Sequence, residues 1–200
     1  ACNAKYIHSN LAVFNLKAYA KEYDSQVVLR EYTINQLKDD ILKDIYRCHP
    51  DVVCVSCYIW NITFVRELMQ DLRKILPDVP FWAGGPEVSY DAETFLGKNP
   101  ALLDRYCGEG GKTFLELVKH YVDGSVTLEE TRGLVYRKAD GALQNNGWRQ
   151  LMDLSKVPFA YENLEDFENR IIYYESSRGC PFFLQLLSVF HRQEIKIPRY

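Results

Sequence analysis

Hydrophobic positions along the chain alternate between two spacings, one helical and one typical of strands. Leu37, Ile41 and Ile45 are four residues apart and would lie on one face of a helix. Residues 52–56 are nearly all apolar, which is typical of a strand covered by helices on both faces. Similar patterns predict strands at 26–32, 80–84 and 103–107, and helices at 11–23, 35–46, 61–76, 91–96 and 113–122. This alternation predicts an α/β fold with a doubly wound parallel sheet.

The first strand of this α/β unit, for which we expect bounds of 1–124, is predicted to be shortened or missing. Only residues 1–4 precede the segment that leads into the first helix. In a flavodoxin-like strand order the first strand is central. A sheet edge exposed by its loss would favour pairing between two copies of the chain, so a homodimer is one expected partner.

A β-hairpin is predicted after the α/β unit. Residues 133–137 and 142–144 flank an Asp-Gly turn signal at 138–141. We therefore expect residues 125–172 to form a linker that carries the hairpin, with one more strand at 170–175. The predicted fold class is flavodoxin-like α/β with a C-terminal hairpin and linker extension.

Composition favours a small molecule or a protein as the partner. The net charge is −3, and 24 basic residues are scattered among 27 acidic ones, which argues against nucleic acid and anionic membranes. No apolar run approaches the roughly 20 residues that span a bilayer, and the N-terminus lacks a signal-peptide pattern, so we expect a cytoplasmic protein.

The cysteines indicate reduced thiols rather than a disulfide framework. They are spread singly through the chain, at Cys2, Cys48, Cys54, Cys57, Cys107 and Cys180. Cys54 and Cys57 form a C-x-x-C pair, which is compatible with redox or metal chemistry. Packing is the preferred interpretation, because the pair lies in a predicted buried strand and no second pair has zinc-type spacing.

Candidate ligand residues lie in the loops after the predicted strands. In open α/β sheets, ligands bind beyond the carboxyl ends of the strands. The residues expected there are His8, Ser9, Ser56, Tyr58, Gly84, Gly85, Pro86, Gly108, Glu109 and Gly110. Glycine lets a backbone approach a broad ligand closely, but it also makes tight turns, and both interpretations stay open. The dinucleotide and Walker spacings are absent. No nucleophile, base and orienter can be placed together, so an independent enzyme is disfavoured.

Three of these loops resemble a known family. Residues 5–12, 82–88 and 108–114 are similar to loops of the cobalamin-binding domains that precede radical S-adenosylmethionine domains, the group that includes the anaerobic magnesium-protoporphyrin monomethyl ester cyclase. Gly111 departs from the pattern, since the family usually has an acid there. The resemblance implies that cobalamin is the cofactor and that the glycine loops and Ser56 contact it.

His8 lies in a frame that differs from the histidine motif of methionine synthase and the mutases. That motif is D-x-H-x-x-G, whereas residues 6–11 read Tyr-Ile-His-Ser-Asn-Leu. The Asp that would orient the imidazole and the Gly are both absent, which argues against a bond from cobalt to His8. The resemblance allows a lower axial position that is vacant or filled by water.

Residues 173–182 resemble the start of a radical S-adenosylmethionine barrel. The family uses C-x-x-x-C-x-x-C to hold a four-iron cluster, but this chain has Cys180 followed by Leu184 and Leu187. The iron–sulfur cluster, with Cys180 as a ligand, and S-adenosylmethionine are therefore expected only in the intact parent protein. Residues 184–190 can be encoded so that reading one nucleotide later gives cysteines at 184 and 187, and the hypothesis is that residues 183–200 are a frameshifted or non-native tail.

The sequence thus predicts a cobalamin-binding domain separated from its catalytic barrel and without turnover of its own. The missing barrel would be its partner, in a parent enzyme that carries out methyl transfer or an oxidative cyclase-like step. The alternative is a flavodoxin-like regulatory or interaction module that no longer binds cobalamin. The altered histidine frame and the shortened first strand favour that alternative.

Overall fold

The computed structural model describes residues 1–99, 105–107, 110–150 and 153–176. The strands are β1 (Cys2–Asn3), β2 (Tyr32–Thr33), β3 (Val53–Ser56), β4 (Phe81–Gly84), β5 (Arg105–Cys107), β6 (Leu134–Arg137) and β7 (Leu143–Asn145). The helices are α1 (Leu11–Tyr19), α2 (Lys38–Arg47), α3 (Ile62–Ile75), α4 (Pro86–Ser89), α5 (Ala92–Lys98) and α6 (Gly110–Val122). Short 3-10 helices lie at Lys21–Gln26, Leu154–Lys156 and Leu164–Phe167.

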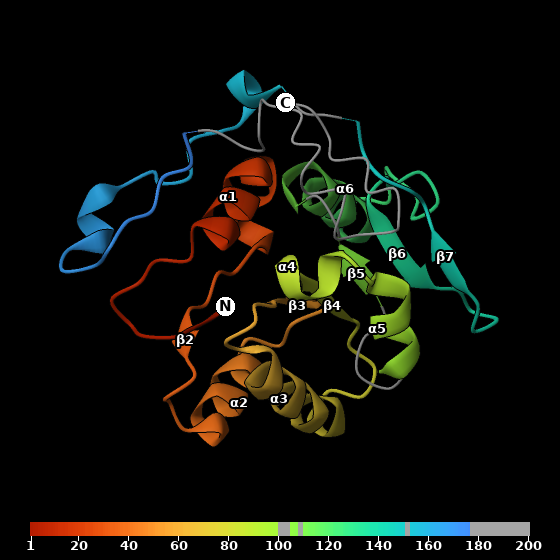
Figure 1. The fold of residues 1–200 in the computed structure, drawn as a ribbon, viewed down its shortest axis with the longest axis horizontal. Helices are drawn as coiled ribbons and strands as arrows, with labels where there is room; N and C mark the ends of the chain where they lie inside the picture. Colours follow the sequence, from red (N-terminus) through yellow and green to blue (C-terminus); the bar gives the residue numbers. More distant parts are fainter. Residues whose placement is uncertain (100–104, 108–109, 151–152, 177–200) are drawn as a thin grey trace, which may run out of the picture.

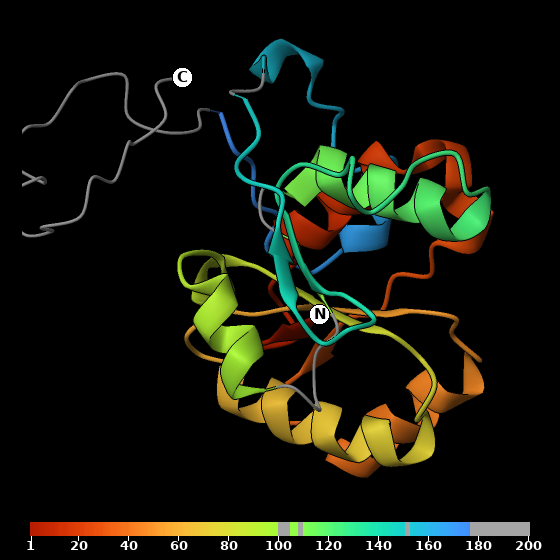
Figure 2. The same cartoon turned by 90° about the vertical axis from the view of Figure 1, so that its right-hand side faces the viewer.

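Helices cover both faces of a central sheet, which confirms the predicted α/β class. Helices α2 and α3 lie on one face, and α1 and α6 lie together on the other (Figures 1 and 2). Within β4, Phe81 and Ala83 pack into the cluster that includes α2 and α3, whereas Trp82 packs with Leu117 of α6 and with Leu134. This alternation explains the continuous apolar run, because each face of the strand is buried against a helix layer.

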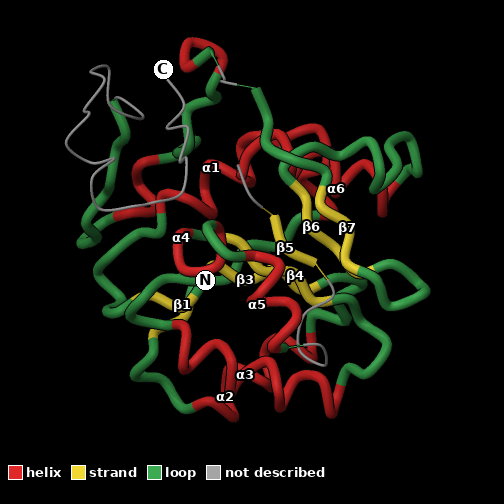
Figure 3. The backbone as a smooth tube through the Cα atoms, turned by 45° about the vertical axis from the view of Figure 1, so that its right-hand side comes forward, coloured by secondary structure: helices red, strands yellow, loops and turns green. Residues whose placement is uncertain are grey.

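The sheet has two parts. Strands β3, β4 and β5 are parallel and in that order, and the antiparallel β6 and β7 extend them (Figure 3). Strands β1 and β2 form a separate parallel pair. The buried Asn61 joins the two parts, since its Nδ2 donates to the carbonyls of Cys2 and Ser56, both at 3.0 Å. The larger sheet has the order β3-β4-β5-β6-β7, and the Asn61 bridge places the end of β1 beside the end of β3, as in the 2-1-3-4-5 order of flavodoxin-like sheets.

The predicted hairpin forms, and it pairs with the sheet. Arg105 and Cys107 of β5 lie opposite Tyr136 and Leu134 of β6. The hairpin thus covers the edge of β5 and is part of the same five-stranded sheet.

Three predicted elements differ from the structure. The strand expected at 26–32 is reduced to β2, because its partner β1 has only two residues to pair with. The strand expected at 170–175 contributes one isolated bridge, between Ile171 and His8. The first helix ends at Tyr19 rather than Tyr23.

Candidate functional site at the carboxyl edge of the sheet

The loops after β1, β3 and β4 form one edge of the molecule in this fold. The parallel strands β3 and β4 end in register, with Ser56 opposite Gly84. The loop after β1 reaches the same edge, because Asn61 joins the carbonyls of Cys2 and Ser56. This is the switch point between β1 and β3, where flavodoxin-like folds bind their ligands.

Ser56 carries a polar atom without a partner. Its Oγ is buried, and among the residues that the structure describes nothing forms a hydrogen bond with it. Buried hydroxyls are nearly always hydrogen-bonded, so this unpaired one, at a strand end, is a candidate partner for a ligand atom or a water molecule.

Gly85 is required by the protein's own packing. It has φ +111°, and a Cβ there would overlap the carbonyl oxygen of Cys57. The amide of Cys57 also donates to the carbonyl of Gly84 at 2.7 Å, and Pro86 starts α4 directly afterwards. Close contact between the loops after β3 and β4 therefore accounts for this glycine, as the tight-turn interpretation expected.

The glycines that begin α6 serve helix packing. A Cβ at Gly110 would lie 3.1 Å from Leu16, and one at Gly111 would overlap the ring of Tyr19, so both let α6 approach α1 closely. A larger side chain at position 111 would therefore meet the ring of Tyr19. Gly108, Glu109 and Cys180 lie outside the described residues.

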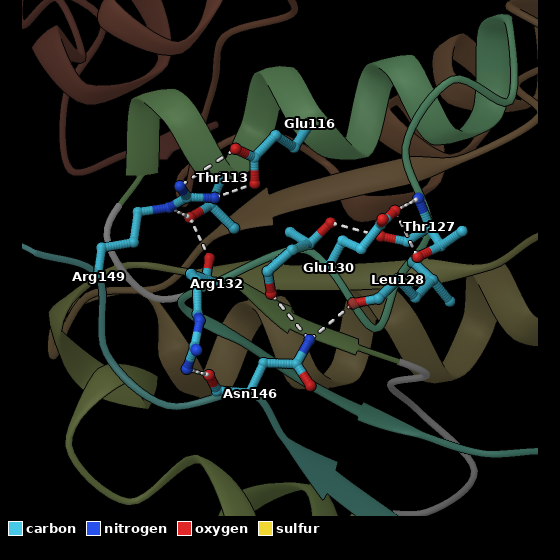
Figure 4. Close-up of polar contacts among 9 residues, drawn as sticks. Thr113, Glu116, Thr127, Leu128, Glu130, Arg132, Asn146 and Arg149 are labelled. Atoms are coloured by element: carbon cyan, nitrogen blue, oxygen red, sulfur yellow. Dashed lines mark hydrogen bonds and ion pairs between the residues drawn. The ribbon is translucent and has the colours of Figure 1, made fainter.

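Thr113, in the same sequence motif, anchors the linker (Figure 4). Its Oγ1 donates to the carbonyl of Arg132 at 2.9 Å and accepts a hydrogen bond from Nε of Arg149 at 2.6 Å. The Arg149 guanidinium also forms an ion pair with Glu116. The Arg149 side chain is 11% exposed and the Glu116 side chain is 20% exposed. The first turns of α6 are thus fixed to the chain on both sides of the hairpin.

His8 and Ser9 are held by the segment that follows the hairpin. Ser9 Oγ donates to the carbonyl of Ile171 at 2.9 Å and lies 3.3 Å from the hydroxyl of Tyr161. Nδ1 of His8 lies 2.7 Å from the hydroxyl of Tyr173. The hydroxyl of Ser9 therefore has its hydrogen-bond partners within the protein. In His8 the contact uses Nδ1 and leaves Nε2 for another partner.

A half-buried acid missed by the sequence analysis organises the loop after β1. Glu31 is 12% exposed and forms an ion pair with Arg170 at 2.8 Å. Its Oε1 also accepts hydrogen bonds from Asn3 Nδ2 and from the amide of Asn10, both at 2.9 Å. The opposite charge and these donors offset the cost of burying the carboxylate.

Exposed apolar side chains follow the elements that lead to this edge. Tyr58 stacks on Trp60, with ring centroids 4.4 Å apart. Trp60 and Ile59 follow β3, Tyr6 follows β1 and Tyr90 follows α4, and these four are 51% to 82% exposed. The sequence analysis assigned Tyr58 and overlooked its neighbours, although aromatic residues just after predicted strands were the available signal.

The described residues contain no candidate metal site and no candidate membrane-spanning helix. Among residues 1–99, 105–107, 110–150 and 153–176, no three His, Cys, Asp or Glu side chains gather as a metal site. Within the same ranges no helix has the length and hydropathy to cross a bilayer.

Comparison with known proteins agrees with this geometry. The family model for the B12 binding domain matches residues 1–118. The cobalamin-dependent radical SAM methyltransferase TokK of Streptomyces tokunonensis is 26% identical over 185 residues, which cover 84% of this chain and 26% of TokK. Cytidylyl-2-hydroxyethylphosphonate methyltransferase of Streptomyces wedmorensis is 32% identical over 107 residues, covering 53% of this chain and 20% of that protein.

Solved structures show the same fold. The apo structure of OxsB, a cobalamin-dependent S-adenosylmethionine radical enzyme, aligns with a TM-score of 0.66 and 19% identity over 86% of this chain and 24% of OxsB. TsrM from Kitasatospora setae, solved with cobalamin and a 4Fe-4S cluster bound, aligns with a TM-score of 0.53 and 18% identity over 78% of this chain and 30% of TsrM.

The chain spans between a fifth and about a quarter of the length of these curated relatives. The matched family model covers the strands and loops that build the carboxyl edge, and it confirms the cobalamin-binding domain expected from the sequence. The chain belongs to the B12-binding domain family.

Proposed function

We propose that this chain binds cobalamin at the carboxyl edge of its sheet as the N-terminal domain of a cobalamin-dependent radical S-adenosylmethionine enzyme, without turnover of its own. The observation that carries the proposal is the buried, unpartnered hydroxyl of Ser56 at the switch point. The exposed apolar rim formed by Tyr6, Ile59, Trp60 and Tyr90 adds support, because a corrin presents a broad face that such side chains contact well.

The residues of this edge have separate roles in the proposal. Ser56 donates its hydroxyl proton to an acceptor atom of the cofactor, and the aromatic rim excludes water from the corrin face. Gly84, Gly85 and Pro86 set the course of the loop after β4, and Tyr58 fixes the start of α3. When bound, cobalamin supplies methyl-transfer chemistry at its cobalt, and the cluster and S-adenosylmethionine belong to the remainder of the parent protein.

Retention of hydroxocobalamin tests the proposal. The purified chain is mixed with hydroxocobalamin and passed through gel filtration, and a corrin spectrum that elutes with the protein is the expected result. If wild-type protein retains no corrin, the regulatory-module alternative replaces the proposal.

Ser56→Ala separates binding from folding. The hydroxyl has no partner in the described protein, so its removal should leave the free energy of unfolding unchanged or slightly higher. Loss of one hydrogen bond to the cofactor should weaken hydroxocobalamin binding about tenfold, measured as Kd by absorbance titration. The exposed Ser25→Ala is the matched control and should bind as wild type. Equal Kd values for both variants would contradict the role of Ser56.

A further inference from the structure

The segment that leaves the domain returns to the loop after β1 in a fixed register. The amide of Ile171 donates to the carbonyl of Ile7 at 2.6 Å, and the amide of Ser9 donates to the carbonyl of Ile171 at 3.1 Å. This parallel bridge places Tyr173 two residues beyond it, on the same side of the chain as Ile171. Figures 1 and 2 show the segment beside α1 and the first loop.

Two further groups of contacts fix the position of Tyr173. Arg170 forms the ion pair with Glu31 and donates to the carbonyl of His8 at 2.9 Å. The hydroxyl of Tyr161 donates to the carbonyl of Tyr173 at 2.8 Å. Tyr161 itself packs against Phe167 and Phe14 of α1, with ring centroids 4.9 Å and 5.4 Å away. The backbone of Tyr173 is therefore held from both sides.

The contact between Tyr173 and His8 has a preferred direction. A neutral imidazole has one N–H and one bare nitrogen, and the hydrogen bond at one nitrogen selects the tautomer. A phenol hydroxyl is a stronger donor than an imidazole N–H, and a bare imidazole nitrogen is a stronger acceptor than a phenol oxygen. The 2.7 Å contact is therefore best satisfied by donation from Tyr173 to Nδ1.

We propose that Tyr173 is a positioning residue for His8, whose ring it orients with the proton on Nε2. His8 then offers the carboxyl edge a hydrogen-bond donor for amide or phosphate oxygens rather than a bare nitrogen for a metal. The identity of that ligand as cobalamin rests on the proposed function, whereas the orientation of the ring by Tyr173 does not. The residue that controls the ring lies 165 positions away, where the chain leaves the domain.

Nuclear magnetic resonance of the cofactor-free chain tests this role. The protein is labelled with ¹⁵N, and long-range proton–nitrogen correlations of the histidine rings are recorded at about pH 8, where imidazole is neutral. The His8 signals are assigned by their loss in His8→Gln. Wild-type His8 should show a single tautomer with the proton on Nε2. Tyr173→Phe should give a detectable Nδ1–H population, seen as an upfield shift of the Nδ1 resonance and a matching downfield shift of the Nε2 resonance.

Tyr174→Phe is the matched control. Tyr174 is the adjacent residue and is 74% exposed, so its hydroxyl should not influence the His8 signals. A wild-type ring protonated on Nδ1, or a Tyr173→Phe spectrum equal to that of Tyr174→Phe, would overturn the proposal. Because the experiment contains no corrin, its result is independent of whether hydroxocobalamin is retained.

Discussion

Asn61 is the residue whose side chain links the two parts of the sheet. It is fully buried and donates to two carbonyls, while its Oδ1 accepts from the amide of Tyr58 at 2.8 Å. Asn61→Ala leaves these three backbone groups unpaired and should lower the free energy of unfolding by about 2–4 kcal/mol. Urea denaturation followed by circular dichroism measures the change.

The exposed Asn35→Ala is the control for this substitution. Asn35 makes one hydrogen bond, at 3.2 Å, to the carbonyl of Ala4. Its replacement should change the free energy of unfolding by less than about 0.5 kcal/mol. A similar loss in both variants would mean that the Asn61 bridge does not join the sheet parts.

Substitutions at Gly85 and Gly124 separate the cost of steric overlap from the cost of an unfavourable backbone conformation. Both have positive φ, but a Cβ meets the Cys57 backbone at Gly85 and nothing within 4 Å at Gly124. Gly124→Ala should cost about 1 kcal/mol of stability for the conformation alone, and Gly85→Ala about 2–4 kcal/mol because overlap adds to it. Thermal and urea unfolding of the two variants measure the difference. Equal costs would show that the loops after β3 and β4 separate easily.

The location of the candidate site could be predicted from the sequence, but the contacts that its residues make could not. The positions of Ser56 and Gly84 at strand ends followed from the apolar runs before them. Gly85 and Gly110 were recognised as unusual, yet a glycine that accommodates a ligand and one that accommodates a neighbouring loop or helix give the same sequence signal. Only the positions of Cys57 and Leu16 show that protein atoms occupy the space.

At the scale of elements, α6 is joined to the segment after the hairpin by the half-buried pair Arg149–Glu116. Arg149→Met removes the guanidinium from Thr113 and leaves Glu116 without its cation, so it should lower the free energy of unfolding by about 2–3 kcal/mol. Lys21→Met, which breaks an exposed pair with Glu162, should have no measurable effect. Urea unfolding compares them, and an unchanged midpoint in Arg149→Met would contradict this role of the network.

The two cysteines of the C-x-x-C pair, Cys54 in β3 and Cys57 just after it, differ in accessibility. Cys54 is exposed and Cys57 is buried, so the expectation that both are packed was wrong for Cys54. Burial raises the pKa of the Cys57 thiol from 9.0 to about 12, and the thiolate is the reactive form. Iodoacetamide at about pH 8 should modify Cys48 and Cys54 but spare Cys2 and Cys57, as read by peptide mass spectrometry. Rapid modification of Cys57 in folded protein would be contrary evidence.

The same pKa shift has a consequence for stability. Above its ordinary value of 9.0 the unfolded thiol loses its proton, while the folded thiol keeps it up to about pH 12. The folded state then binds more protons than the unfolded state, so stability falls as the pH rises through this range. Cys57→Ala should reduce this part of the alkaline slope in urea unfolding measured between these pH values.

Elements were predicted well where two signals agreed. Residues 62–75 have helical spacing and lie between two apolar strands, and the predicted helix matches α3 to within a residue at each end. Residues 26–32 had only β-branched composition, and pairing depends on a partner strand that the local sequence does not encode. The two-residue β1 limits β2 to two residues, whatever its propensity.

At the scale of the whole molecule, the return of residues 159–173 to α1 was not predictable. Contacts such as that between Arg170 and His8 join positions 162 residues apart, and no local pattern specifies them. Arg170→Met should release this segment because it removes the cation from Glu31. Hydrogen exchange at the amides of Ser9 and Ile171 should accelerate, whereas amides of β4 should be unaffected.

Arg47→Met is the control for this prediction. Arg47 is exposed at the end of α2, away from the first loop, so its loss should leave exchange at both amides unchanged. Unchanged exchange in Arg170→Met as well would mean that the segment is held by its aromatic contacts alone.

The bridge between His8 and Ile171 also affects the order in which parts of the chain can fold during synthesis. During synthesis the chain emerges from its N-terminus, and the strands and helices up to residue 145 leave the ribosome before residue 171 does. The loop that carries His8 acquires its last contacts only when Tyr173 has left the ribosome. The order of translation therefore delays completion of this loop until after the strands and helices that precede residue 171 have emerged.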